Sequence, residues 1–512
     1  MFLGKLFWQL SIIFFLFGNI ISGNGLVEQK AMAGSKENEK LKSDLKRYAE
    51  IISTLDTHYA DSIDINEVVI QSIKRMLTSL DPFSSLQDGE AFRDFQFFQS
   101  GMYAGIGANL IEIEGERVVH STIPGSPASE AGILPGDIIF AIDDLPLRGL
   151  PLPKVKQLFH GVKGSSIRII LKRFGLTNPL ELNISRELLP ELSIPLCFQL
   201  KPTVIYLKLV SFSDVTQMEF DECLVPHLPY LNGLIIDLRD NVGGSLKSGI
   251  QVADRLLDIN DLIMTTQGDS SNTSNEYYAT TDVKKLDVPV VVIINNKTAS
   301  AAEILAGAIK DNRKGLIVGQ NSFGKGLIQT VLPLKSGHAL FLTTGKWFTP
   351  LGINVKHNNM EFLRKRIFFS EEENRYYAAN PFKDLFFNNS GVDKGGISPD
   401  IYLKTRALSP FLVTAILDHL FFNFSREFWF KYRKLAESGK LDEALVSEFF
   451  EFLKSKKINV SIEEFKKNID YIKLFIQSNL LLMAGKSIEA YIVLLKNDPY
   501  VLLAIDSLKQ TK

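Results

Sequence analysis

Cysteine, histidine and an excess of charge are scarce in this sequence, and each shortage argues against a class of function. The only cysteines, Cys197 and Cys223, rule out a scaffold built from many disulfides; two buried thiols and one disulfide fit equally well. The seven histidines are scattered, and the Cys223–His227 pair has no further ligand nearby, so we expect no metal and no cofactor. A formal net charge of −1 gives no reason to expect a nucleic-acid partner.

The start of the sequence also lacks an apolar run long enough for a membrane-spanning helix. Its run at residues 10–17 is shorter than the ~20 residues that such a helix needs. Lys5 precedes the run, and small residues such as Ser22 and Gly25 follow it. This pattern is typical of a signal peptide, so residues 1–25 predict export to the periplasm or cell envelope. An uncleaved anchor close to a membrane is the alternative.

The 512 residues are enough for roughly two to four domains, and the pattern of apolar and polar residues changes along the chain. Residues 29–40 are polar and aperiodic, which predicts a linker; apolar spacing then predicts two helices that end before Pro82. Short strands follow from about 101 to 187, then strongly apolar strands alternate with helices, as in a sheet covered on both faces. From about Ser409 the pattern is helical again. The expected strands are 117–120, 137–142, 166–171, 204–207, 234–238 and 290–294.

A turn of small residues follows the last of these strands. It reads KTASAAE at residues 297–303, and good helix formers begin near Ala301. Ser300 in this turn would project at the carboxyl end of the strand, beside the unpaired amides of a helix start, which suit a developing oxyanion. On this segment alone, a simple helix N-cap is the alternative role for Ser300.

The segment GQNSFGKG at residues 319–326 contains the first part of a phosphate-loop motif. Gly326 stands where that motif needs Ser or Thr to hold Mg²⁺, and the residues after it predict a strand, so a phosphate-loop ATPase is not supported. Lys325, between two glycines, is better interpreted as a desolvated amine that acts as a general base. Gln329 falls on the same face and would orient that amine. A solvated turn lysine is the alternative.

The segment DLRDNVGG at residues 237–244 includes the end of a buried strand and the turn after it. Gly243 and Gly244 allow the backbone to approach a ligand closely and offer amide donors. An ordinary glycine turn is the alternative.

Together these three segments resemble the signatures of the C-terminal processing (tail-specific) serine proteases, a PDZ-containing family with a catalytic Ser–Lys pair. Lys325 follows Ser300 at the family's spacing, whereas Thr298, Ala302 and Val242 depart from its pattern without removing a reacting group. The site that the resemblance implies consists of catalytic Ser300, Lys325 and Gln329, and of oxyanion-hole amides from Ala301 and from Gly243 or Gly244.

The resemblance extends over about residues 45 to 403. In the PDZ domain that it implies, a loop would hold the substrate's terminal carboxylate in backbone amides while the peptide adds a strand. The residues of this loop are Tyr103, Ala104, Gly105, Ile106, Gly107 and Ala108. The other matching segments are SLDPFSSL at 79–86, the PDZ-like segments 124–128 and 131–137, FTPLG at 348–352 and GGISPD at 395–400. An insertion of unknown purpose spans about 356 to 394.

The fold that the resemblance implies is an α/β protease core (crotonase/ClpP-like) with an inserted PDZ domain. The spacing of apolar residues adds N- and C-terminal helical segments to this expected fold. The implied function is that of an exported serine endopeptidase that recognises the C-terminal tails of protein or peptide substrates. Membrane proximity and an oligomer are left open. The expected parts are a signal peptide (1–25), a linker and N-terminal helical region (26–100), a PDZ domain (101–187), a Ser–Lys protease core (188–405) and a C-terminal helical extension (406–512).

Two further alternatives concern the chemistry. A Ser–His–Asp triad could use His227 or His338, although the lysine match is the more specific signal. An inactive PDZ scaffold on a protease fold has no chemical need for Ser300, Lys325 and Gln329 together. Asp311 matches an aspartate of the family, for which we expect a structural role.

Overall fold

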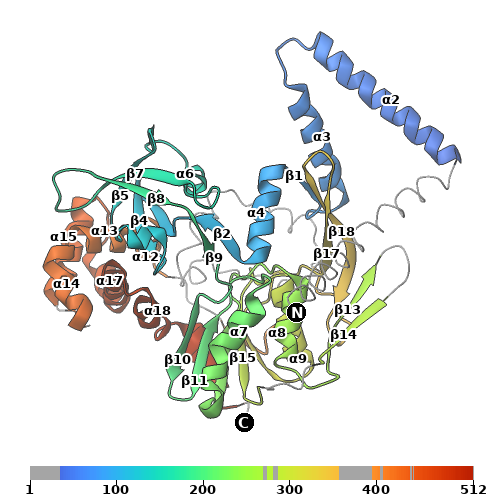
Figure 1. Ribbon diagram of the computed structural model, residues 1–512. Coiled ribbons are helices and arrows are strands. Elements are labelled where there is room, and N and C mark those ends of the chain that lie inside the picture. The colour runs from blue at the N-terminus through green and yellow to red at the C-terminus, as the bar shows by residue number, and fades with distance from the viewer. Residues whose placement is uncertain are drawn as a thin grey trace, which may run out of the picture. The chain divides into compact units, whose positions relative to one another are not determined.

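The computed structural model describes residues 35–268, 274–280, 286–356, 395–403, 408–438, 441 and 443–510 (Figure 1). The expected signal peptide and nearly all of the 356–394 insertion lie outside these residues. The chain divides into two compact units, with the boundary between Leu80 and Asp81. Within the described residues, no helix has both the length and the apolar character needed to cross a membrane.

The first unit contains two helices, α2 (Ser35–His58) and α3 (Ile65–Leu80). The hydroxyl groups of Tyr48 and Ser72 form a hydrogen bond between them. The linker expected at 29–40 is wrong for its last six residues, which already belong to α2. Lys and Glu in this stretch are good helix formers, and their polarity is compatible with an exposed helix.

The second unit begins with β1 (Ser85–Gln87) and α4 (Gly89–Ser100), followed by a small antiparallel sheet in the order β3-β4-β5-β7-β8, with β6 on β5. Strand β3 lies at one edge of this sheet, and β2 pairs separately with β9. The strands expected at 117–120, 137–142 and 166–171 are confirmed as β4, β5 and β7. The elements are β2 (Met102–Gly105), β3 (Ala108–Ile113), β4 (Glu116–Thr122), α5 (Pro127–Glu130), β5 (Ile138–Ile142), β6 (Leu145–Pro146), α6 (Leu152–Phe159), β7 (Ser166–Lys172), β8 (Leu180–Ser185) and β9 (Glu187–Pro190).

A six-stranded sheet in the order β10-β11-β12-β15-β16-β19 forms the centre of the second unit. All its pairs after β10–β11 are parallel, so the turns after β12, β15 and β16 emerge at the same edge. The strands expected at 204–207, 234–238 and 290–294 are confirmed as β11, β12 and β15. The elements are β10 (Leu196–Lys201), β11 (Val204–Lys208), α7 (Thr216–Leu224), the 3₁₀ helix η1 (Val225–Tyr230), β12 (Gly233–Asp237), α8 (Leu246–Asp254), β15 (Val290–Ile294), α9 (Ala301–Asp311), β16 (Gly315–Gly319) and β19 (Ile401–Tyr402).

A second sheet in the order β1-β18-β13-β14, with β17 on β18, lies beside this core (Figure 1). Gln329 of β17 is opposite Thr343 of β18, and the Thr343 amide donates to the Ser84 hydroxyl. This pairing brings the turn before β1 close to β17. The elements are β13 (Leu262–Gly268), β14 (Ser274–Tyr278), β17 (Leu327–Pro333) and β18 (Ala339–Phe348).

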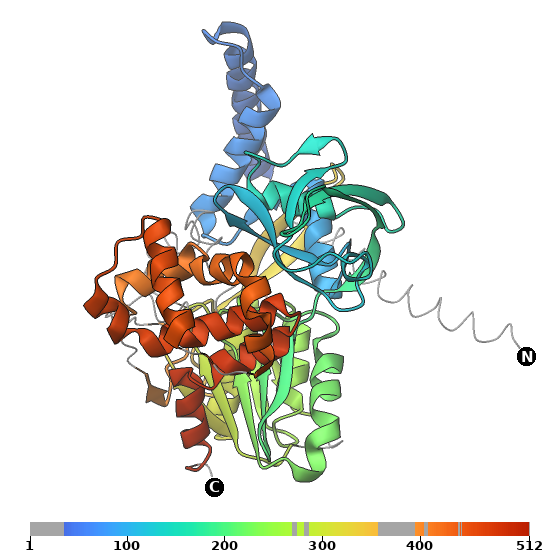
Figure 2. The same cartoon turned by 90° about the vertical axis from the view of Figure 1, so that its left-hand side faces the viewer.

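Helices cover both faces of the six-stranded sheet. Alternate residues such as Leu234, Ile236 and Val292 pack with α8 and α9. Their neighbours Ile235 and Val291 pack on the other face with the last helices of the chain, which Figure 2 shows in red beside the sheet. The strands are therefore apolar on both sides because each side has its own helical layer.

The chain ends in a helical region that also packs against the small antiparallel sheet. Phe422 forms a buried cluster with Ile111, Ile113 and Val118, and its ring lies 5.2 Å from the His120 ring, centroid to centroid. The helices are α12 (Pro410–Leu417), α13 (Leu420–Glu427), α14 (Trp429–Ser438), α15 (Glu443–Ser455), α16 (Ile462–Lys467), α17 (Ile469–Met483), α18 (Ser487–Leu495) and α19 (Pro499–Ser507).

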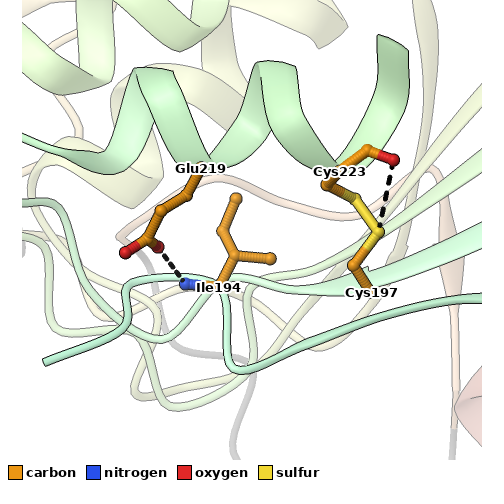
Figure 3. The surroundings of a disulfide bond; sticks show 4 residues. All are labelled: Ile194, Cys197, Glu219 and Cys223. Carbon is orange, nitrogen blue, oxygen red and sulfur yellow. Dashed lines mark hydrogen bonds between the residues drawn. A yellow bond between two sulfur atoms is a disulfide. The ribbon is translucent and has the colours of Figure 1, made fainter. Parts of the chain in front are cut away.

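Cys197 of β10 and Cys223 of α7 form a disulfide, which answers the question that the sequence left open (Figure 3). In the same region, the Ile194 amide donates to the Glu219 carboxylate at 2.8 Å. Helix α7 is thus joined at two points to β10 and the residues just before it, at the antiparallel end of the sheet.

Candidate active site

Ser300 ends the serine turn (residues 295–300), which connects β15 to α9. Thr298 fixes this turn, because its hydroxyl donates to the Leu238 carbonyl at 2.8 Å and accepts from the Asn295 amide at 3.0 Å. Ser300 itself has φ 58° and ψ −120°, a conformation that costs a non-glycine residue free energy. Ser300 is half-buried, and such strain at a serine between a strand and a helix is typical of a catalytic nucleophile.

The glycine turn (residues 238–244) lies directly against the serine turn. The Ala299 amide donates to the Asn241 carbonyl at 2.8 Å. Gly243 has φ 99°, and a Cβ atom built on it would lie 2.7 Å from the Ser300 Cβ and 3.0 Å from the Ala301 nitrogen. Only glycine allows the two turns to approach this closely.

The amides of the two turns differ in their partners. The Gly243 amide donates to the Asn241 side-chain oxygen at 2.8 Å. Among the described residues, no acceptor is paired with the amide of Gly244 or of Ala301. Of the two glycines that the sequence suggests for an oxyanion hole, Gly244 therefore has the amide available for a ligand.

Lys325 lies in the lysine loop (residues 320–326), which precedes β17, so the strand expected after Gly326 is confirmed. Its Nζ donates to the Gln329 Oε1 at 2.6 Å, and the Gln329 Nε2 donates to the Phe83 carbonyl at 2.7 Å. The Lys325 Nζ is also 5.0 Å from the centroid of the Phe83 ring. The Phe83 carbonyl thus determines which atom Gln329 presents to the amine.

Burial lowers the pKa of Lys325, although the nearby charges of Glu303 and Asp81 oppose the shift. Asp81 accepts hydrogen bonds from the Ser84 hydroxyl and from the amides of Phe83 and Ser84. Burial alone would raise the pKa of Asp81, but these bonds hold it below its usual value. A larger fraction of Lys325 is therefore neutral near pH 7 than for an exposed lysine.

Glu303 joins the serine turn to the lysine loop. Its fully buried carboxylate accepts from the Ser300 amide at 2.8 Å, the Gly324 amide at 2.7 Å and the Lys325 amide at 2.9 Å. The Ser322 hydroxyl is a fourth donor. Burial raises the pKa of Glu303, and these four hydrogen bonds oppose that shift by favouring the ionised form.

The sequence reasoning missed this role of Glu303, although a signal was present. A glutamate three residues after a serine at a helix start is the pattern of a capping box, in which the glutamate reaches back to the serine amide. That pattern accounts for the bond to Ser300 but gives no sign of the bonds to Gly324 and Lys325, which lie more than twenty positions away.

The other titratable candidates lie in different surroundings. His227 is in η1, and the His338 ring contacts the Ser336 hydroxyl in the β17–β18 hairpin. Neither forms a hydrogen bond to Ser300 or Lys325 in the part of the chain that the structure describes. The Asp311 carboxylate accepts from the Leu351 amide at 3.1 Å, which is a structural contact. No three His, Cys, Asp or Glu side chains of the described residues gather as metal ligands.

The PDZ-like sheet has a groove of about 390 Å³ next to its edge strand β3. Four of the six predicted loop residues line it: Tyr103, Ile106, Gly107 and Ala108. Ala104 and Gly105 belong to β2, where they pair with Leu188 and Glu187. Lys156, Phe159 and His160, on and after α6, also line this groove.

The sequence of this chain is similar to those of known peptidases and PDZ domains. The model of peptidase family S41 matches residues 203–361, and a PDZ domain model matches residues 118–173. A carboxy-terminal-processing protease of Bartonella bacilliformis is 31% identical over 351 residues, which cover 67% of this chain and 80% of that protein. The carboxy-terminal processing protease CtpA of Bacillus subtilis is 32% identical over 337 residues, which cover 65% and 70%. Among solved structures, a photosystem II D1 C-terminal processing protease is 25% identical, covers 70% of this chain and 93% of that one, and has a TM-score of 0.37.

The S41 match includes the serine turn, the glycine turn and the lysine loop, and the PDZ match includes β4, β5, α6 and β7. The two curated relatives are each matched over more than two thirds of their own length. The chain therefore belongs to the carboxy-terminal-processing proteases of peptidase family S41 and is a serine-type peptidase with a PDZ domain.

Proposed function

We propose that this protein is an exported endopeptidase that binds the C-terminal tails of protein substrates and cleaves them through an acyl-enzyme on Ser300. The observation that supports this most directly is the buried carboxylate of Glu303, which binds the amides of both Ser300 and Lys325. A single carboxylate thereby fixes the backbone positions of both the proposed nucleophile and the proposed base. A protein that used this fold only as a scaffold would have no need of that arrangement.

In the proposed reaction, neutral Lys325 accepts the Ser300 proton while the Ser300 Oγ attacks the carbonyl carbon of the substrate. The Lys325 ammonium then gives this proton to the amine of the leaving peptide as the C–N bond breaks. Water next attacks the ester, its proton passes to Lys325, and the acid product leaves as Ser300 regains a proton. Gln329 keeps the amine directed during both steps, because its own amide is held by the Phe83 carbonyl.

The developing oxyanion would be stabilised by the amides of Ala301 and Gly244. Gly244 belongs to the glycine turn and Ala301 directly follows the serine turn; hydrogen bonds already fix both turns, so little reorganisation is needed when charge appears. Ala301 also begins α9, whose N-terminal end favours negative charge.

Substrate tails would bind in the groove beside β3. An extended peptide can pair with this edge strand through its backbone, while the backbone amides near Ile106 and Gly107 receive its terminal carboxylate. Ile106 is fully buried in the PDZ core and supports the loop from beneath.

Export is supported by two independent features. The signal-like start of the sequence indicates secretion, and the Cys197–Cys223 disulfide is of a kind that persists in oxidising compartments. We also propose the domain division at 25, 100, 187 and 405, which rests on the sequence pattern together with the family resemblance. A crotonase/ClpP-like core is proposed from the family resemblance alone.

The test compares wild type with Ser300→Ala on candidate exported proteins and records intact masses of the products. Ser300→Ala should lower the rate of cleavage by several orders of magnitude and prevent labelling by a fluorophosphonate probe. Ser336→Ala, in the exposed β17–β18 hairpin, is the matched control and should behave as wild type. Near-normal turnover by Ser300→Ala would exclude Ser300 as the nucleophile.

A further inference from the structure

The side chain of Arg239 extends from the glycine turn into a buried cluster of charges. It is only 4% exposed, and its guanidinium lies 2.6 Å from the Asp237 carboxylate and 2.8 Å from the Asp498 carboxylate. Asp237 ends β12, two residues before Arg239, whereas Asp498 comes from the far end of the chain. The helical extension therefore contributes directly to the surroundings of the turn that carries Gly244.

The charges in this cluster balance. The Lys208 ammonium lies 3.1 Å from Asp237 and also donates to the Arg239 carbonyl at 2.8 Å, so two cations face two carboxylates. Burial alone would raise the pKa of Asp237, but the charges of Arg239 and Lys208 hold it below its usual value. Loss of the Asp498 charge would leave one buried cation uncompensated, which is strongly unfavourable.

The start of α19 surrounds Arg239 with more than one contact. One Asp498 oxygen accepts from the amides of Tyr500 and Val501 and caps the helix, while the other faces Arg239. The Tyr500 ring lies 4.9 Å from the guanidinium carbon and is fully buried. Carboxylate and ring together hold the guanidinium between α19 and the sheet.

The backbone next to Arg239 is bonded to the serine turn. The Asp240 amide donates to the Asn295 side chain at 2.9 Å, and Asp240 has φ 63°. Asn241 then accepts two hydrogen bonds, one from the Ala299 amide to its carbonyl and one from the Gly243 amide to its side-chain oxygen. A displacement of Arg239 would therefore move a strained turn that is bonded to the serine turn and leads directly to Gly243, which approaches Ser300, and to Gly244.

We propose that Asp498 is a positioning residue for proteolysis. It holds Arg239, and through Arg239 it holds the glycine turn in the geometry that the oxyanion requires. The inference rests on the proposed function of Ser300 and Gly244. It gives the helical extension a role in the chemistry beyond its packing against the sheet.

The test uses Asp498→Asn in the full-length protein, because asparagine caps a helix as well as aspartate but carries no charge. The number of reactive sites is first counted by fluorophosphonate labelling of Ser300 run to completion, and peptide cleavage is then expressed per labelled site. We expect kcat per site to fall by about tenfold or more, with the ~10²–10³-fold effect of losing a whole oxyanion donor as the upper limit. KM should be unchanged, because Asp498 does not line the peptide groove.

Asp506→Asn is the matched control, since Asp506 lies on the same helix but is exposed and pairs with nearby Lys509. If Asp498→Asn folds too poorly to be counted, Tyr500→Leu tests the same idea while keeping both carboxylates. An unchanged kcat per site, or a change in KM alone, would overturn the inference. If Ser300→Ala is inactive while Asp498→Asn equals wild type, only this inference fails, whereas an active Ser300→Ala refutes the proposed function itself.

Discussion

Replacing Gly243 by alanine tests how closely the glycine turn must approach Ser300, the proposed nucleophile. At φ 99°, backbone strain alone should lower the free energy of unfolding of the alanine variant by about 1–2 kcal/mol. Its Cβ would also lie 2.7 Å from the Ser300 Cβ and 2.8 Å from the Ala299 oxygen. Because carbon atoms pack at about 3.5–4.0 Å, one turn must shift by about 1 Å. A displacement of about 1 Å at reacting groups costs ~10²-fold in rate, so kcat/KM should fall by at least that factor.

Gly337→Ala separates this effect from backbone strain. Gly337 has φ 83° in the β17–β18 hairpin, and a Cβ there would meet nothing within 4 Å. Both variants should therefore lose a similar amount of stability from φ, measured by urea unfolding, but only Gly243→Ala should lose most of its peptide cleavage. Equal kcat/KM for the two variants would refute the idea that the turns are held in contact for catalysis.

Three further predictions concern charge and cross-linking. Glu303→Gln replaces an acceptor oxygen by an amide NH₂ donor at a site where four other donors converge. It should therefore lower the free energy of unfolding by at least about 1.5–3 kcal/mol, the contribution of one charge-assisted hydrogen bond. Unchanged urea unfolding would contradict the role of Glu303 in joining the serine turn to the lysine loop. Because burial lowers the pKa of Lys325, the rise of kcat/KM with pH should have its midpoint below pH 10.5. The Asp81 charge raises this pKa, so Asp81→Asn should move the midpoint to lower pH. A midpoint at or above pH 10.5 would exclude Lys325 as the base. Reduction of Cys197–Cys223 should remove about 3–4 kcal/mol of stability, and identical unfolding curves with and without reductant would refute this.

Local patterns in the sequence were enough to predict the secondary structure around the proposed site. An apolar run that ends at Ile294, small residues and then good helix formers predict a strand, a turn and a helix, and β15 and α9 have those bounds. Gly326 and the strand-like residues after it argue correctly against a phosphate loop. Each of these inferences depends on neighbours in the sequence, which is why the sequence alone sufficed.

Contacts between distant segments could not be read in the same way. The spacing of Val501, Ala504 and Leu508 indicates a buried face on α19 but does not name the sheet that covers it. Nothing near Asp498 indicates that its partner is Arg239, more than two hundred residues earlier. Such pairs follow from topology, which one sequence does not reveal.

The position of α19 has a consequence for how the enzyme is made. A chain is synthesised from its N-terminus, so β11, β12, β15 and β16 exist long before the helix that covers one of their faces. Until α19 arrives, that apolar face stays open to solvent and Arg239 lacks Asp498. Chains that have not yet been synthesised as far as α19 should therefore be poor proteases, and peptide cleavage should appear only after α19 has packed on the sheet and Asp498 has paired with Arg239.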